Sequence, residues 1–195
     1  MRDNPRVLPY LDMPIQHISD AVLKKMNRGG NRKQIETVIE KLRREIPDMV
    51  IRTTVIVGFP GETDEQFNEL LDFVKTARLN RLGAFAYSRE EGTPAFDMPD
   101  QIAPEVKQQR YESLMEAQAQ ISFEHQQSVI GQMRDVLCES FDPEEELFVG
   151  RDFSNGFDVD GKVFFSSGTP VQAGDFVKVK ITDANEYDLF GKIAE

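Results

Sequence analysis

The sequence of 195 residues contains one cysteine, Cys138, and two widely separated histidines, His17 and His125. Such a chain forms no disulfide framework, and it has too few thiolate and imidazole ligands for a zinc or iron–sulfur site of its own. No apolar run approaches the roughly 18 residues of a membrane span, and the first 14 residues lack the continuous apolar core of a signal peptide. These absences predict a cytoplasmic protein with no membrane partner.

Positive charge is also scarce, because 23 Lys and Arg stand against 34 Asp and Glu, giving a net charge of -11. A chain of this charge repels the phosphate groups of nucleic acids and of anionic membranes. The deficit is uneven: residues 129–195 carry 6 basic and 14 acidic side chains, whereas residues 1–128 have a net charge of only -3. This change in composition predicts two domains, 1–128 and 129–195.

Residues 1–128 alternate between strand and helix patterns. The segment 49–59, MVIRTTVIVGF, is nearly continuous in β-forming residues, which is typical of a strand covered on both faces in a parallel sheet. Weaker strand patterns lie at 7–15, where two prolines limit pairing, and at 82–88. Two successive βαβ units predict a right-handed parallel layer, either an open sheet or part of a barrel.

Helix signals separate these strands. Asn31 with Gln34, and Thr63 with Gln66, have the spacing of capping boxes, and each pair precedes an amphipathic segment. Pro104 suits the first turn of a long third helix.

From about residue 130 the pattern changes to short alternating segments separated by SNG, DG and AGD turns. The Asp160-Gly161 pair is a type I′ hairpin signal. About five short strands in 65 residues predict a small five-stranded antiparallel barrel of the OB kind. The predicted fold class is therefore α/β followed by all-β.

The best candidate for a ligand site is the stretch TTVIVGFPGET, in which a buried strand runs into a Gly-Phe-Pro-Gly turn and a capped helix. Gly58 and Gly61 allow close backbone approach, and open α/β folds bind ligands at the carboxyl edge of the sheet. A tight, well-capped turn without a ligand would have the same spacing. No Lys-Ser/Thr follows the glycines, so the stretch is not a phosphate loop.

Polar residues follow the two neighbouring strands at the same predicted edge. Asp12, Gln16 and His17 lie near the end of the first strand, although a buried core role is the more common one for a lone histidine such as His17. The third strand is followed by a polar loop that would equally serve as a solvated surface; its residues are Tyr87, Ser88, Arg89, Glu90 and Glu91.

Three segments carry a family resemblance: PYLDMPIQHISDAVLKKMNRGG at 9–30, RTTVIVGFPGETDEQF at 52–67 and LGAFAYSREEGTPAF at 82–96. Together they resemble the radical S-adenosylmethionine methylthiotransferase family, in the branch that modifies an aspartate of ribosomal protein S-twelve. The acidic terminal barrel resembles the TRAM domain of that family. The resemblance implies the C-terminal half of a partial (β/α) barrel followed by a TRAM barrel.

The resemblance implies S-adenosylmethionine as cofactor and two iron–sulfur clusters in the complete enzyme. The cluster cysteines of the family are absent from this sequence, so they are expected in a missing N-terminal half, and this chain alone is expected to be inactive. Radical chemistry at an aspartate β-carbon would install the methylthio group. The expected cofactor contacts are polar for Gln16 and Thr54, backbone approach at Gly58 and packing beside adenine for Tyr87.

The acidic barrel is expected to dock the basic ribosomal protein S-twelve or the small ribosomal subunit, and to avoid nucleic acid. The docking residues expected in or near its loops are Glu144, Glu145, Glu146, Asp152, Asp158 and Asp160. Two alternatives remain open at this point: the branch of the same family that modifies an adenosine in tRNA, and a non-catalytic acidic protein-binding module.

Overall fold

A computed structural model describes residues 1–194, which divide into two compact units. The α/β unit comprises Arg2 and Leu11–Ile121, and the barrel unit comprises Met1, Asp3–Tyr10 and the chain from Ser122 onward. The division therefore falls a few residues before position 129, and it groups the N-terminal segment with the barrel. None of the helices within residues 1–194 is long and apolar enough to cross a membrane.

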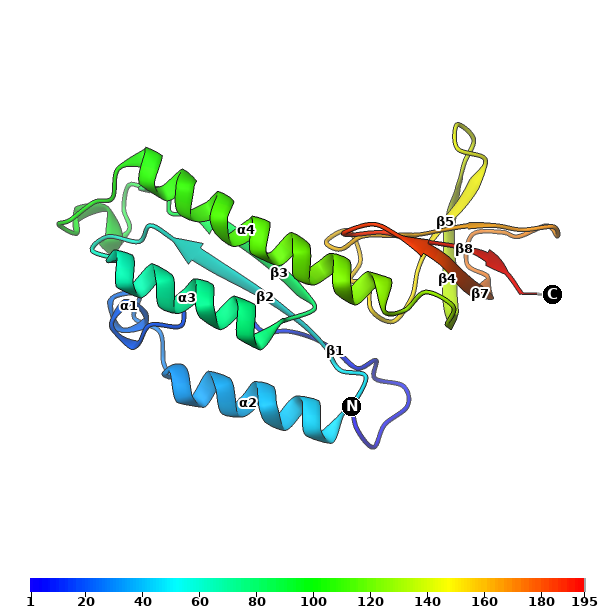
Figure 1. Cartoon of the computed structure of the whole chain (residues 1–195), viewed down its shortest axis with the longest axis horizontal. Helices are drawn as coiled ribbons and strands as arrows, with labels where there is room; N and C mark the ends of the chain where they lie inside the picture. Colours follow the sequence, from blue (N-terminus) through cyan, green and yellow to red (C-terminus); the bar gives the residue numbers. More distant parts are fainter. Residues whose placement is uncertain (195) are drawn as a thin grey trace. The chain divides into compact units, whose positions relative to one another are not determined.

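The α/β unit contains a three-stranded sheet in the order β1-β2-β3, with helices in the connections (Figure 1). Its elements are β1 (Tyr10–Asp12), α1 (Asp20–Lys25), α2 (Arg32–Glu45), β2 (Val50–Val57), α3 (Asp64–Ala77), β3 (Arg81–Ala86), the 3-10 helix η1 (Pro94–Asp97) and α4 (Pro104–Gln127). β2 and β3 pair in parallel, as predicted. β1 is only three residues long because Pro9 and Pro14, on either side of it, have no N–H to donate.

Both predicted capping boxes are present. The Asn31 side chain accepts from the Gln34 N–H at 3.0 Å and the Gln34 side chain accepts from the Asn31 N–H at 3.0 Å, which starts α2. Thr63 and Gln66 make the same reciprocal pair at the start of α3. These side chains satisfy N–H groups that have no partner within the helix, so both helices begin where the sequence predicts.

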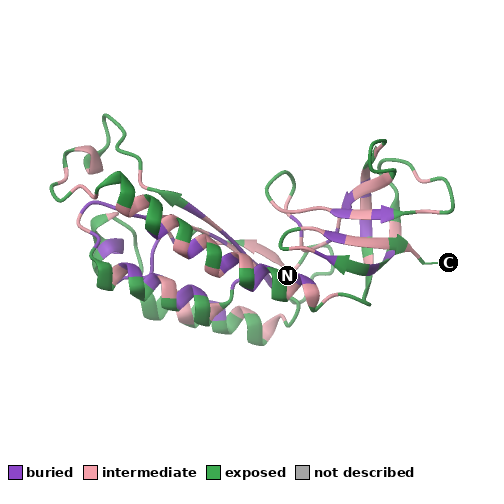
Figure 2. Cartoon of the chain, turned by 45° about the horizontal axis from the view of Figure 1, so that its top comes forward, coloured by how far each residue is buried: buried purple, intermediate pink, exposed green. Residues whose placement is uncertain are grey.

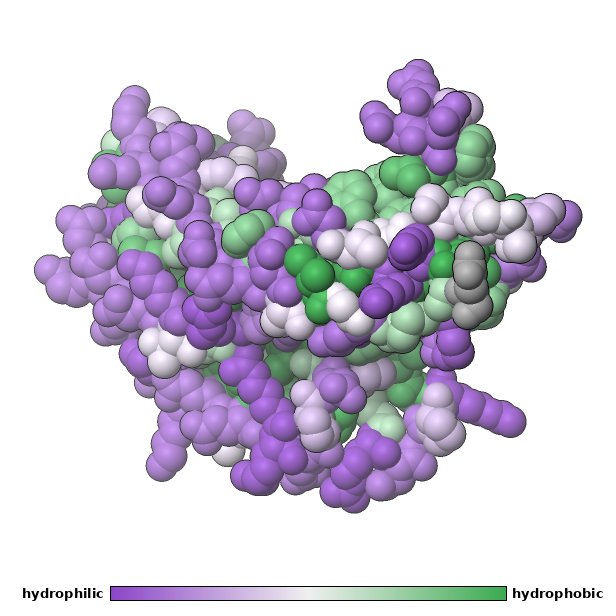
Figure 3. Space-filling view, turned by 45° about the vertical axis from the view of Figure 1, so that its right-hand side comes forward, coloured by the Kyte–Doolittle hydropathy of each residue, from purple (hydrophilic) through white to green (hydrophobic). Residues whose placement is uncertain are grey.

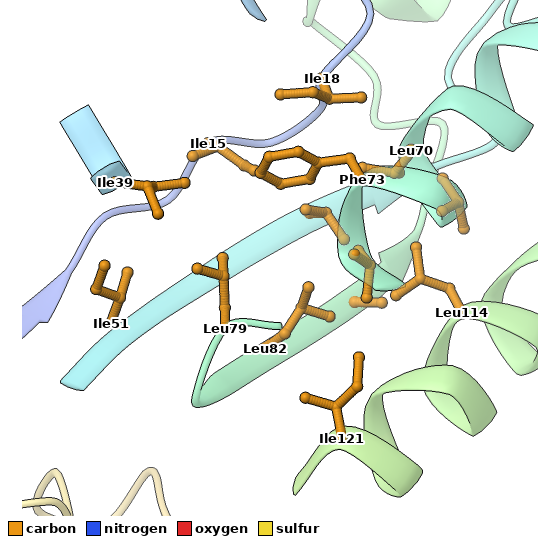
Figure 4. Packing of buried hydrophobic residues seen from close by; sticks show 14 of the residues in the cluster. Ile15, Ile18, Ile39, Ile51, Leu70, Phe73, Leu79, Leu82, Leu114 and Ile121 are labelled. Atoms are coloured by element: carbon orange, nitrogen blue, oxygen red, sulfur yellow. The ribbon is translucent and has the colours of Figure 1, made fainter. Parts of the chain in front are cut away.

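One face of the sheet builds the core of the α/β unit. Alternate β2 residues, among them Ile51 and Val55, are fully buried, and they pack with residues from β3, α2, α3 and α4 in one cluster (Figure 4). The other face carries Arg52, Thr54 and Ile56, which are half-buried. Successive side chains of a β-strand point to opposite faces, so one set of β2 side chains packs against the helices. The other set is not needed for this core.

The barrel unit contains a closed barrel with strand order β4-β5-β6-β8-β7. Its strands are β4 (Met133–Asp142), β5 (Leu147–Arg151), β6 (Val163–Ser166), β7 (Phe176–Ala184) and β8 (Leu189–Ile193). Buried residues such as Val136, Phe165 and Val179 form its core. Figure 2 shows buried positions along the barrel strands. All predicted strands are present, but β6 and β8 pair in parallel, so the barrel is not wholly antiparallel. The parallel pair arises because β7 lies on the far side of β8, between β8 and β4.

The Asp160-Gly161 pair does not form the predicted two-residue hairpin turn. It lies in the long connection between β5 and β6, and neither residue has a positive φ. A Cβ at Gly161 would instead collide with the carbonyl oxygen of Tyr187. Close backbone packing, rather than a type I′ turn, therefore explains this glycine.

The Gly161→Ala variant should be less stable by about 2 kcal/mol or more, because the added methyl overpacks against backbone that cannot move aside. Gly168→Ala is the matched control, since no atom lies near its added Cβ, and its effect should stay within about 0.5 kcal/mol. Urea unfolding of both variants measures the difference. Equal stabilities would contradict the packing argument.

Candidate functional site

The carboxyl ends of β1 and β2 meet at Gln16. Its N–H donates to the Thr54 carbonyl at 2.9 Å, and its carbonyl accepts from the Ile56 N–H at 2.8 Å, in a parallel bridge. Gln16 has a φ of 67°, a left-handed conformation that costs a non-glycine residue about 1–2 kcal/mol. The two backbone hydrogen bonds to β2 hold Gln16 in this strained conformation, at the predicted edge of the sheet.

A cavity of about 260 Å³ lies at this edge. Most of its lining is apolar, and its polar part consists of amide, hydroxyl and cationic side chains with no carboxylate. The lining residues are Gln16, Lys25, Met26, Asn27, Arg28, Ile56, Phe59, Thr93, Pro94, Ala95 and Met98. This composition favours a ligand with an apolar ring and an anionic group.

The turn that contributes Phe59 to the cavity is held by a buried carboxylate, that of Glu62. One carboxylate oxygen accepts from the N–H of Gly58 at 2.7 Å and from that of Phe59 at 3.2 Å. The other accepts from Arg110 Nη1 of α4 at 2.9 Å, and Arg110 also pairs with Asp64 at 2.6 Å. Burial raises the pKa of Glu62, while Arg110 and the two N–H donors oppose that rise.

His17 lies behind the same turn and is fully buried. Its Nδ1 accepts from the Ser19 N–H at 3.0 Å, and its Nε2 lies 3.8 Å from the Glu62 carboxylate. Burial, and then the charge of Arg110, lower the pKa of His17 to about 4. The imidazole is therefore neutral at pH 7, with its proton on Nε2 facing Glu62, and the core role is the one observed for this histidine.

Lys107 of α4 joins the ends of β2 and β3. Its Nζ donates to the Tyr87 carbonyl at 3.0 Å and lies 4.9 Å from the Tyr87 ring centroid. Its methylene groups occupy the space beside Gly58, where a Cβ would clash with them. Gly58 has a φ of 72°, so its conformation and its contact with Lys107 both require a glycine, whether or not a ligand approaches.

Of the four predicted cofactor residues, Gly58 is covered by Lys107, and the other three occupy different places relative to the cavity. Gln16 lines it directly. Thr54 lies two residues before Ile56 on the same face of β2. Tyr87 packs edge-on against Phe59, with ring centroids 5.3 Å apart, and so supports the wall from behind.

The residues that hold the turn were missed by the sequence prediction: Glu62, Arg110 and Lys107. Only Glu62 had a weak signal in the sequence, since it directly follows the Gly-Phe-Pro-Gly turn. Arg110 and Lys107 had none, because they meet the turn only through the packing of α4, more than 40 residues later.

The six predicted docking residues of the barrel also differ in exposure. Glu144, Glu145 and Glu146 form the exposed tip between β4 and β5, and Asp158 is exposed as well. Asp160 accepts hydrogen bonds from the Tyr10 hydroxyl at 2.6 Å and the Gly156 N–H at 2.7 Å, so it fixes its own loop.

Asp152 is the exception among the six, because its side chain is fully buried. It accepts from the N–H and the hydroxyl of Ser154, at 2.8 and 2.6 Å, and lies 3.5 Å from Arg134 Nη1. A buried carboxylate cannot dock a partner at the surface, so its role in the structure is to order the loop after β5.

Metal ligands are not gathered anywhere in residues 1–194, where no three His, Cys, Asp or Glu side chains are placed to share an ion. Cys138 is buried in the barrel, and burial raises the pKa of its thiol. The thiol therefore remains protonated and behaves as a small core side chain.

Arg110→Met should lower the free energy of unfolding by about 3–5 kcal/mol, because it leaves the buried Glu62 charge without its cation. Adding Glu62→Gln removes that charge, so the double variant should be more stable than Arg110→Met alone. Urea unfolding of the single and double variants tests this sign. A double variant less stable than Arg110→Met would contradict the pairing.

The low pKa of His17 predicts a loss of stability in acid. The unfolded chain takes up a proton near pH 6.5 whereas the folded chain resists until about pH 4, so stability present above pH 6.5 falls by up to about 3 kcal/mol across that interval. Protonation of Glu62, whose pKa is raised, acts in the opposite direction. His17→Asn keeps an acceptor for Ser19 without the titration.

Stability measured in urea at several pH values from 7 to 4 should therefore fall more steeply for the parent than for His17→Asn. Parallel pH profiles for the two proteins would show that His17 is not the group responsible.

Comparison with known proteins finds two family matches, one in each part of the chain. Residues 1–74 match the radical SAM superfamily, and residues 130–194 match the TRAM domain. The chain is 50% identical over 194 residues to the "Ribosomal protein uS12 methylthiotransferase RimO" of Geotalea uraniireducens (strain Rf4), covering 99% of this chain and 43% of that relative. The protein of the same name from Citrifermentans bemidjiense is 49% identical over 196 residues, covering 100% of this chain and 44% of the relative.

The protein of that name from Geobacter sulfurreducens is 48% identical over 194 residues, covering 99% of this chain and 43% of the relative. The chain thus spans less than half the length of these curated relatives. The predicted resemblance to the radical S-adenosylmethionine methylthiotransferase family is confirmed along the whole chain, since about half of its residues are identical to those of relatives named RimO.

Proposed function

We propose that this chain is the C-terminal part of an enzyme that adds a methylthio group to the β-carbon of an aspartate in ribosomal protein uS12. The observation that carries the proposal is the identity of about half of all residues, over the whole chain, to relatives named for that activity. A substrate that is a ribosomal protein supports a cytoplasmic location.

The edge cavity of the α/β unit is proposed as part of the S-adenosylmethionine site. Ile56 and Phe59 offer apolar surface for adenine, the Gln16 amide can bond ribose hydroxyls, and Lys25 and Arg28 can attract a carboxylate. When bound, S-adenosylmethionine supplies the radical chemistry by which this family activates a carbon–hydrogen bond. The residues of this chain bind and orient it and keep water from the apolar wall.

The two iron–sulfur clusters of the proposed complete enzyme do not fit the residues of this chain. The single cysteine is buried in the barrel core, and one thiolate cannot hold a cluster. Cluster ligands would come from an N-terminal half, and no step at a cluster is assigned to this chain.

The barrel is proposed to dock uS12 or the small ribosomal subunit rather than tRNA. Four of the six Lys and Arg side chains in residues 129–195 lie in ion pairs with carboxylates of the same segment; they are Arg134, Arg151, Lys162 and Lys178. Few cations therefore remain to neutralise phosphates, whereas the exposed tip at 144–146 offers three carboxylates to a basic protein.

The direct test is a hybrid enzyme in which this chain replaces the matching segment of the Geobacter sulfurreducens relative. Expressed in a strain lacking uS12 methylthiotransferase, the hybrid should add the mass of one methylthio group to uS12, measured by mass spectrometry. The resident segment and an empty vector are the controls.

Two results would favour the alternatives. A methylthio group on tRNA adenosine, with uS12 unmodified, would assign the chain to the tRNA branch. A folded hybrid that binds uS12 and modifies neither substrate would support a non-catalytic binding module.

Charge reversal tests the docking tip. Replacing Glu144, Glu145 and Glu146 by Lys in the full chain should weaken uS12 binding at least tenfold at low salt, because attraction becomes repulsion. Calorimetry or biolayer interferometry measures the affinity. A matched control reverses three exposed glutamates of the α/β unit, namely Glu40, Glu69 and Glu105. Equal losses in both variants would show a net-charge effect rather than a docking site.

A further inference from the structure

Two aromatic side chains of the barrel are more exposed than its other exposed rings, Phe141 and Tyr187. Phe157 in the loop after β5 is 65% exposed, and Phe176 at the start of β7 is 75% exposed. In the space-filling view, apolar side chains interrupt the mostly hydrophilic surface (Figure 3). An exposed phenylalanine ring does not contribute the free energy that its burial would provide in the folded chain. Exposed rings of this kind often mark a surface that binds a partner.

The strand register places these two rings on one outer face. Arg151 of β5 pairs with Leu137 of β4, and Leu137 pairs with Phe176 of β7. Directly opposite residues in antiparallel strands point to the same side. The Phe157 ring lies 5.7 Å from the Arg151 guanidinium, so it continues the row. We call Phe157, Arg151, Leu137 and Phe176 the aromatic row.

The charges along the aromatic row favour a basic partner. Arg151 is neutralised by Glu139 at 2.7 Å, and Glu139 also holds Lys162 at 3.2 Å. Both exposed rings are adjacent in sequence to an exposed carboxylate, Phe157 to Asp158 and Phe176 to Asp175. A ring beside a carboxylate accommodates Lys or Arg, whose stem packs on the ring while the head meets the charge.

From Arg151 to Phe176 the row crosses two strand spacings, on the order of 10 Å. That length is sufficient for several residues of an extended chain, and the half-buried Leu137 between the ends offers an apolar contact. We propose that the aromatic row binds an extended, Lys/Arg-rich segment of a protein partner. The inference rests on the proposed docking of uS12, and it assigns a contact surface separate from the acidic tip.

The test uses the full chain, with purified uS12 as the probe. Phe157→Ser with Phe176→Ser should weaken binding at least tenfold, while the salt dependence stays close to that of the parent because no charge is removed. The matching leucine substitutions should recover part of the affinity by restoring apolar contact. Tyr187→Ser is the control: Tyr187 is 51% exposed on the same barrel, beyond the opposite end of β7, and its loss should change affinity less than twofold.

The outcomes separate this inference from the docking proposal. If the double serine variant binds uS12 within twofold of the parent while reversal of residues 144–146 weakens binding, the aromatic row is overturned and the docking proposal stands. If the parent does not bind uS12, both fail. The double serine variant could instead lose binding to a single-stranded RNA oligonucleotide, or lose self-association in sedimentation, while its uS12 affinity is unchanged. Either result would identify another occupant and overturn the proposal for the aromatic row. Urea midpoints confirm that each variant folds.

Discussion

The carboxylate of Glu62 is the interaction on which the α/β unit's candidate site depends. It bonds the backbone N–H groups of Gly58 and Phe59, pairs with Arg110 and faces the neutral His17. Three segments distant in sequence thereby meet at one carboxylate: the segment after β1, the turn after β2 and the N-terminal part of α4. A buried charge of this kind is tolerated only when its bonds are complete, so the turn has little freedom to move.

The arrangement explains how an apolar cavity acquires a rigid edge. Phe59 can form a wall because its own N–H is held by Glu62, and because Tyr87 supports its ring from behind. Gln16 completes the edge in a strained left-handed conformation fixed by hydrogen bonds to β2 on both sides. Preorganised backbone of this sort lowers the ordering cost of binding a small cofactor.

In the barrel unit, charge is sorted by position. Most of the basic side chains are on or beside strands and are paired with nearby carboxylates, whereas the exposed acids Glu144, Glu145 and Glu146 lie in a loop. The outer face can therefore carry exposed aromatic rings without forming a phosphate-binding surface. This sorting supports a protein as partner more strongly than the net charge alone.

Local chemistry was readable in the sequence. Capping residues such as Asn31 and Thr63 marked helix starts, and the alternation of the barrel strands followed from their side-chain pattern. The strand β2 was predicted to be covered on both faces, but only one face is fully buried and the other is half-buried. The burial of Asp152, the parallel pairing of β6 with β8 and the partnership of Glu62 with Arg110 depend on contacts between distant segments. A charged residue in a loop resembles a surface residue until the fold encloses it, which is why Asp152 was expected at the surface.

The most direct measurement is a crystal structure of the reconstituted hybrid enzyme with S-adenosylmethionine bound. The account predicts that the cofactor lies in the edge cavity, with Gln16, Ile56 and Phe59 in contact and the Glu62–Arg110 pair unchanged behind the turn. Cofactor bound elsewhere, with this cavity still open, would contradict it.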